Sequence, residues 1–149
     1  MSEKIVFSSA NEFELQQEKN VRNWLLSTIE YENKTLGEIG FVFCDDAFLL
    51  NLNQEYLQHD TFTDIISFDY SFGNTLQGEI YISTERVKEN AEKYDTSFEN
   101  ELRRVMVHGV LHLCGYKDKT TEEKEKMRQK EDEKLQLFHV EQSPKKPSS

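Results

Sequence analysis

The stretch from 101 to 118, ELRRVMVHGVLHLCGYKD, constrains the fold more than any other part of the chain. If it forms a helix, with about 100° between successive residues, apolar side chains cover nearly its whole circumference. Such a helix is a buried one. The exception is a narrow polar stripe, which is made by Glu101, Arg104, His108 and His112. Other elements must therefore cover this helix, and the polar side chains of the stripe must have either binding partners or a function.

The rest of the chain supplies short strands and further helices. We predict strands at 4–7, 38–44, 64–70 and 78–83, the last two being antiparallel and joined by a loop longer than a tight hairpin. We predict helices at 15–30, 45–56, 84–94, 97–114 and 121–138, with capping boxes (Thr96 with Glu99, Thr120 with Glu123) opening the last two. This order indicates an α+β fold, with one small mixed sheet of about four strands packed with about five helices. We expect a single metal-hydrolase-like domain over 1–140 and a disordered polar tail over 141–149.

Charge and composition narrow the classes of partner. The net charge of −10 argues against a general nucleic-acid coat protein. Residues up to Glu101 include 7 basic and 20 acidic ones, a net of −13, whereas the remainder has 11 basic and 8 acidic ones, a net of +3. A polyanion should therefore prefer the C-terminal third.

The sequence also indicates a compartment. It has no apolar run of the roughly 20 residues that a spanning helix needs, and its start does not resemble a secretory signal. Two cysteines, Cys44 and Cys114, make no disulfide framework, which is typical of a reducing cytoplasm. We therefore expect a cytoplasmic protein without a membrane partner.

His108 and His112 stand one helical turn apart on the polar stripe, which is the spacing that offers two nitrogen ligands to one metal ion. The alternative is a pair of buried, hydrogen-bonded imidazoles, but without a metal this arrangement costs desolvation for little return. Gly109 follows His108 where zinc peptidases of the H-E-x-x-H type carry their glutamate base. The pattern thus argues against peptidase chemistry of this kind, while metal-assisted hydrolysis stays open, since a metal ion can activate water by itself.

Asp118 is the best candidate for a third ligand, because Gly115 ends the helix and lets the chain fold back. Cys114 lies about 200° around the helix from His112 and faces elsewhere, while His59 and His139 stay open as alternatives. A His-His-Asp set leaves a fourth tetrahedral position open for water, as in catalytic zinc sites. It also suits ferrous iron, so zinc is the first expectation and iron the second.

These residues resemble those of a known family. HGVLHLCGYKD at 108–118 is similar to the signature H-G-x-L-H-L-x-G-Y-D-H of the bacterial YbeY proteins, which are endoribonucleases and rRNA maturation factors. Leu52-Asn53 with Tyr56, TDIISF at 63–68 and GEIYIS at 78–83 resemble further segments of that family in the same order. The resemblance runs from about 40 to 135, which is most of the expected domain.

The resemblance implies a zinc-dependent hydrolase of single-stranded RNA that acts in 16S rRNA 3′-end maturation and ribosome quality control, together with the small ribosomal subunit. It implies that His108 and His112 are metal ligands and that metal-activated water attacks a phosphodiester. Asp118 stands where the family has a third histidine, and Leu57 where it usually has an arginine. A carboxylate ligand adds negative charge, which weakens the metal as a Lewis acid and makes the site less attractive to phosphate.

Other residues have weaker assignments. Arg104 is a candidate for phosphate contact or catalysis in place of the missing arginine, or else it forms an ion pair with Glu101. Ser67 and Asp64 are candidates for lining the cleft, or else Asp64 caps a turn and Ser67 packs. Lys117 and Lys119 flank Asp118 and are candidates for holding the RNA backbone, or else they are simply solvated. The rival function is a non-catalytic ribosome-assembly factor with a structural metal.

Overall fold

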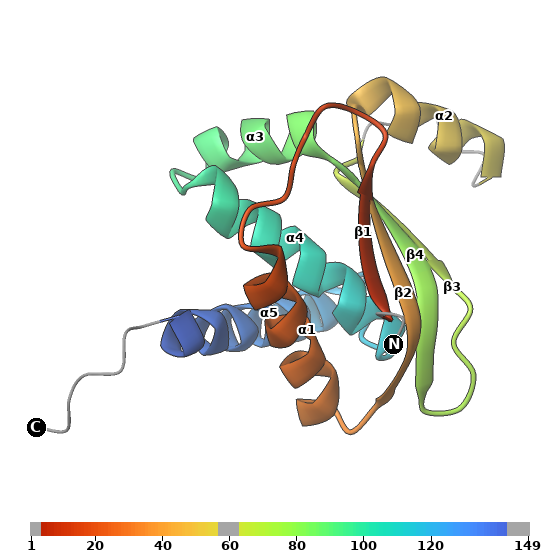
Figure 1. Ribbon diagram of the computed structural model, residues 1–149, viewed down its shortest axis with the longest axis vertical. Coiled ribbons are helices and arrows are strands. Elements are labelled where there is room, and N and C mark those ends of the chain that lie inside the picture. Colours follow the sequence, from red (N-terminus) through yellow and green to blue (C-terminus); the bar gives the residue numbers. More distant parts are fainter. Residues whose placement is uncertain (1–3, 57–62, 143–149) are drawn as a thin grey trace, which may run out of the picture.

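In a computed structural model, which describes residues 4–56 and 63–142, four strands form one sheet and five helices surround it (Figure 1). The elements are β1 (Ile5–Ser9), α1 (Glu18–Tyr31), β2 (Thr35–Cys44), α2 (Asp46–Tyr56), β3 (Ile65–Asp69), β4 (Thr75–Ser83), α3 (Thr84–Lys93), α4 (Phe98–Leu113) and α5 (Thr121–Gln142). The strand order is β1-β2-β4-β3, with β1, β2 and β4 parallel and β3 antiparallel to β4. The predicted mixed sheet in an α+β fold is confirmed.

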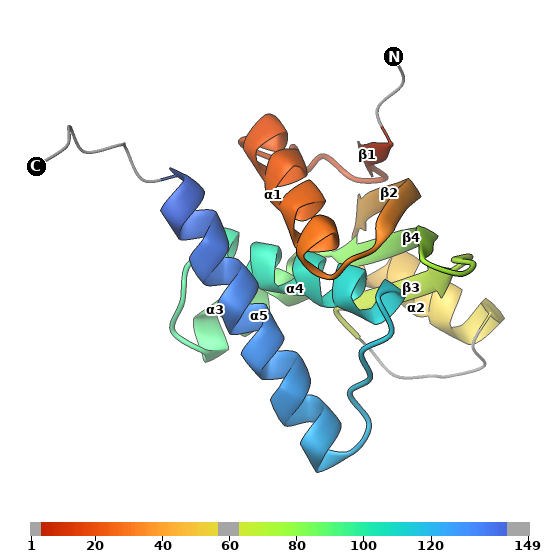
Figure 2. The same cartoon turned by 90° about the horizontal axis from the view of Figure 1, so that it is seen from below.

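Alternation along the strands determines which face of the sheet is covered. Ile39, Phe41 and Phe43 of β2 are buried, and so are Ile80 and Ile82 of β4. All five belong to the main core, together with apolar side chains of α1, α4 and α5. Figure 2 shows α1 and α5 lying across α4, so the helix that the sequence predicts to be buried lies between the sheet and these two helices.

The opposite face of the sheet carries a smaller apolar cluster under α2. Cys44, Leu49 and Ile66 are buried there, and Phe68 and Tyr81 pack against them. Helix α2 begins at Asp46, one residue later than expected, and the Asp45 carboxylate accepts a hydrogen bond from the backbone N–H of Phe48 at 2.9 Å. In the part of the chain that the structure describes, no helix is both long and apolar enough to span a membrane.

Three local predictions are wrong. The β3–β4 connection is a tight hairpin, because Gly73 has a φ of 58° and lets Phe72 and Thr75 exchange backbone hydrogen bonds of 3.1 and 3.0 Å. The N-cap of α4 is Ser97, whose hydroxyl accepts from Asn100 N–H at 3.1 Å. Thr96 N–H closes α3 by donating to Ala91 O at 3.0 Å, so it is not available to the Glu99 carboxylate, as the expected capping box requires.

The third wrong prediction concerns the end of the final helix. This helix runs to Gln142 and so includes His139, which we expected to lie beyond it. The second capping box is confirmed, because Glu123 N–H donates to the Thr120 hydroxyl and Thr120 N–H donates to the Glu123 carboxylate, both at 3.0 Å. Residues 143–149, most of the expected tail, lie outside the described residues.

Candidate metal centre

Helix α4 carries both histidines on the side that is not covered by the core. The ring centroids of His108 and His112 are 4.7 Å apart, with an angle of 75° between the ring planes. Both side chains keep part of their surface accessible, 19% for His108 and 33% for His112. The one-turn spacing therefore places the two imidazoles together, as the sequence predicts.

Gly109 sets how close α4 comes to the sheet. A Cβ atom at this position would lie 3.0 Å from side-chain carbons of Ile65 and Ile80, which is tighter than ordinary packing contacts. The glutamate of an H-E-x-x-H motif has no room here, because its side chain would have to enter the core. The missing general base is thus a consequence of helix–sheet packing.

The chain turns back after α4 and returns Asp118 to the histidines. Gly115 has a φ of 109°, and Tyr116 N–H donates to Leu111 O at 3.1 Å. This turn places Asp118 Oδ2 at 3.3 Å from His108 Nε2, and Asp118 Oδ1 at 3.5 Å from His112 Nε2. The structure therefore brings together His108, His112 and Asp118, whose candidate ligand atoms all lie within 4.8 Å of one another.

The donor set fits a divalent metal ion. Ligands at about 2.0–2.1 Å from a tetrahedral zinc ion are separated by about 3.3 Å. The two His–Asp distances of 3.3 and 3.5 Å match this separation closely. Two imidazoles and one carboxylate also suit iron(II), so the cluster can hold a metal ion without specifying which one.

Glu131 of α5 orients the first histidine, and sequence reasoning missed it. Its Oε2 lies 2.6 Å from His108 Nδ1, and its side chain is only 7% exposed. With Nδ1 donating to a carboxylate, Nε2 of His108 presents its lone pair toward Asp118 and any bound metal. Nothing in the sequence distinguishes Glu131 from the other acidic residues of this charged helix, since its burial depends on how α5 crosses α4.

The pKa values of the two histidines are shifted in opposite directions in the metal-free site. Burial lowers the pKa of His108, but the hydrogen bond and charge of Glu131, with the charge of Asp118, more than offset this, so the pKa is raised. Burial and the charge of His108 lower the pKa of His112, although Asp118 opposes the shift. His108 is thus the more basic of the two imidazoles, and His112 is the less basic.

Arg104 does not pair with Glu101, which corrects that alternative for its role. Its Nη1 lies 2.9 Å from Glu131 Oε1 and its Nη2 lies 2.8 Å from Asp132 Oδ1. The reason is that α5 crosses this part of α4 and presents two carboxylates to the guanidinium. Glu101 is buried, and this burial raises the pKa of its carboxyl group. Arg104 lines the cavity described next, but its charge is already balanced.

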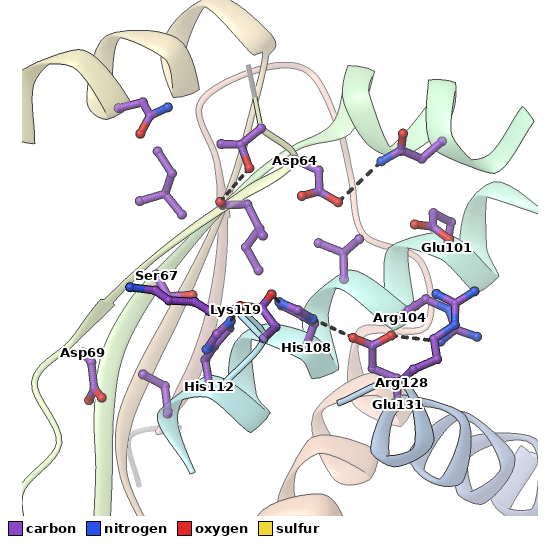
Figure 3. A pocket seen from close by; sticks show the side chains of 18 of the residues that line it. Asp64, Ser67, Asp69, Glu101, Arg104, His108, His112, Lys119, Arg128 and Glu131 are labelled. Carbon is purple, nitrogen blue, oxygen red and sulfur yellow. Dashed lines mark hydrogen bonds and ion pairs between the residues drawn. The ribbon is translucent and has the colours of Figure 1, made fainter. Parts of the chain in front are cut away.

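His108, His112 and Asp118 line a cavity of about 910 Å³ between α4, β3 and the start of α5 (Figure 3). Ser67 and Asp64 line it as the sequence suggested, and burial raises the pKa of Asp64. Of the two lysines that flank Asp118, Lys119 lines the cavity, whereas Lys117 is exposed outside it. His139 does not line it, and Leu57 and His59 lie outside the described residues.

A buried polar cluster anchors the loop between the second and third candidate ligands. The Tyr116 hydroxyl donates to Glu32 Oε1 at 2.6 Å, and Lys134 Nζ lies 3.0 Å from Glu32 Oε2. Lys134 is 1% exposed. Burial raises the pKa of Glu32, but hydrogen bonds from Tyr116 and Lys134 outweigh it, so the pKa is lowered. The cluster ties α1 and α5 to the loop that carries Asp118.

The fold and the site define an α+β protein in which two histidines and one aspartate can hold a metal ion. Comparison with known proteins places it in a family. The family described as Endoribonuclease YbeY matches residues 5–139. Two relatives named Endoribonuclease YbeY cover 93% of this chain: that of Christiangramia forsetii is 60% identical, with 97% of its length covered, and that of Flavobacterium psychrophilum is 57% identical, with 99% covered.

The solution structure of a Thermotoga maritima protein is also similar, with a TM-score of 0.61 and 25% identity over 97% of this chain and 99% of the other. This chain belongs to the YbeY family. The resemblance inferred from the motifs at 63–68, 78–83 and 108–118 is therefore confirmed.

Proposed function

We propose that this chain is a zinc-dependent endoribonuclease that cuts single-stranded RNA in 16S rRNA 3′-end maturation and ribosome quality control, working with the small ribosomal subunit in the cytoplasm. The names of its relatives support endonucleolytic cleavage of RNA. The observation that carries the proposal is a cluster of three metal-binding side chains that lines a large open cavity.

The chain's own residues have distinct tasks in this reaction. His108 and His112 offer their Nε2 atoms, and Glu131 holds the Nδ1 proton of His108 so that the ring keeps its orientation. Asp118 adds a carboxylate oxygen and one negative charge to the donor set. When bound, a metal ion supplies an activated water for phosphodiester hydrolysis and a positive charge beside the reacting phosphate.

The rival function, a non-catalytic assembly factor with a structural metal, fits the site less well. Structural zinc sites are closed by four protein ligands, whereas catalytic ones keep a position open. Among the residues that the structure describes, three potential ligands cluster, and the Asp118 side chain, which lines the cavity, is 38% exposed. This openness favours a metal that meets a substrate.

The first experiment measures zinc content by elemental analysis in the wild type and in Asp118→Ala, both prepared without chelators. We expect about one zinc per chain in the wild type and a strong loss in the variant. Asp69→Ala is the matched control, because Asp69 lines the same cavity but does not belong to the ligand cluster. No bound metal in the wild type would contradict the metal-dependent mechanism.

The second experiment separates the two functions. End-labelled single-stranded RNA and the same strand annealed to its complement are incubated with metal-loaded and metal-free protein, and the melting temperature of each form is recorded. An enzyme cuts the single strand only when loaded, while the metal-free form stays folded. Loss of the fold on metal removal, without cleavage by the loaded form, would instead support the assembly factor.

A further inference from the structure

The charge of the cavity poses a problem for a polyanionic substrate. Five carboxyl groups line it, from Asp64, Asp69, Glu101, Asp118 and Glu131, against three cationic side chains, from Arg104, Lys119 and Arg128. Asp118 aggravates this imbalance, because it brings a negative charge where a neutral histidine would bring none. An RNA phosphate therefore needs positive charge at the cavity that other groups have not already neutralised.

Only two of the three cationic side chains can provide positive charge that is not already neutralised. Arg104 uses both of its terminal nitrogens in ion pairs with α5, at 2.9 Å from Glu131 and 2.8 Å from Asp132. Lys119 and Arg128 are exposed, and neither forms an ion pair with the residues that the structure describes. The charges of Lys119 and Arg128 therefore remain available to a phosphate, whereas the charge of Arg104 is used in its ion pair with Glu131.

The backbone places both side chains beside the candidate ligands. Lys119 directly follows Asp118, and its N–H donates to the Glu123 carboxylate at 3.1 Å, which fixes this residue at the entrance to α5. Arg128 precedes Glu131 by three residues on α5, so the two share one face of that helix. Arg128 also lines an adjoining hollow of about 410 Å³, together with His108, Asp118 and Lys124.

We propose that Lys119 and Arg128 hold the phosphates of a single-stranded RNA on either side of the three candidate metal ligands, and that Arg104 and Lys117 do not. A guanidinium can bind a phosphate in a bidentate manner, and an ammonium acts as a point charge, so both side chains suit this substrate. Figure 3 shows Lys119 near Ser67 and the two histidines, and Arg128 with Arg104 and Glu131 at α5, on the other side of His108. The RNA strand accordingly runs from the β3 side of the cavity past the candidate ligands toward α5. This inference rests on the proposed function.

The test measures equilibrium binding of a fluorescein-labelled oligouridine RNA by anisotropy at several salt concentrations. Metal-loaded Lys119→Gln and Arg128→Gln are compared with the wild type, and gels verify that the RNA stays intact. The matched control is Lys126→Gln, which removes the same charge from an exposed position of α5 that lines neither hollow. Zinc content and melting temperature establish that each variant keeps its fold and its metal.

We expect each substitution at 119 or 128 to raise the Kd about threefold to tenfold. The slope of log K against log salt should fall by about 0.7 for each lost phosphate contact with a single strand. Lys126→Gln should bind as the wild type does. Wild-type affinity and slope in both variants would overturn this inference alone, whereas a wild type that binds no RNA would overturn the proposed function with it.

Discussion

The replacement Glu131→Gln tests whether the buried carboxylate tunes the metal site through His108. The substitution preserves the size of the side chain but removes the charge that lies 2.6 Å from His108 Nδ1. Loss of such an orienting partner typically costs 10-fold to 100-fold in metal affinity, or about 1.4–2.8 kcal/mol. Because the Glu131 side chain is only 7% exposed, solvent screens this interaction little, and we expect a value within that range.

The pH dependence distinguishes tuning from general loosening of the site. In the wild type Glu131 raises the pKa of His108, so a proton competes with the metal for this residue up to a higher pH. In the variant this pKa falls, and the loss of affinity on acidification begins at a lower pH. The ratio of wild-type to variant affinity should thus be largest above pH 7 and should shrink as the pH falls toward 5.

The assay is competition for zinc with a chromophoric chelator between pH 5 and 8, on the full chain. Asp132→Asn is the matched control, because Asp132 contacts Arg104 but makes no contact with His108 among the described residues. We expect its zinc affinity to stay within about twofold of the wild type. Equal affinities for wild type and Glu131→Gln, or a ratio that does not change with pH, would refute the reasoning.

Three further perturbations test the packing around the site. Gly109→Ala should lower the free energy of unfolding in urea by about 1–2 kcal/mol, because the new Cβ meets Ile65 and Ile80 at 3.0 Å. Gly40→Ala, with no atom near its Cβ, should change this free energy by less than about 0.5 kcal/mol. Equal changes in the two variants would contradict this account. Tyr116→Phe removes the 2.6 Å bond to Glu32 and should cost about 1.5 kcal/mol by the same measurement, a loss that Tyr70→Phe, at an exposed position, should not cause. Burial raises the pKa of Cys114 to about 12, so iodoacetamide at pH 8 should alkylate it far more slowly than in urea-unfolded chain, as mass spectrometry would show; equal rates would disprove a protected thiol.

The features that could be predicted from the sequence are those that depend on one element at a time. The helical period alone places His108 and His112 on one side of α4, and a glycine at a helix end is enough to expect Asp118 to return toward them. Alternating apolar residues in β2 and β4 likewise indicate which face of the sheet is buried.

Partners that meet across two elements could not be predicted, because the sequence does not give the angle at which helices cross. Glu131 lies 23 residues from His108, and Arg104 lies 27 residues from its partner Glu131. Within α4 the nearest acidic neighbour of Arg104 is Glu101, and the ion-pair alternative for Arg104 therefore named the wrong carboxylate. The tight hairpin at Gly73 was missed for a different reason, since β4 begins at Thr75, earlier than its apolar pattern suggests.

The polar stripe of α4 can now be explained as one unit. Arg104 neutralises Glu131, Glu131 fixes His108, and His108 together with His112 faces Asp118. The stripe therefore supplies two of the three candidate ligands and the cation that balances Glu131, but no cation that is free to meet a substrate. If Arg104 left its ion pair to bind phosphate, the Glu131 carboxylate would be a further unpaired negative charge beside the candidate metal ligands. Arg104 therefore cannot do so without weakening the site. Positive charge for the substrate must come from outside α4, which is where Lys119 and Arg128 lie.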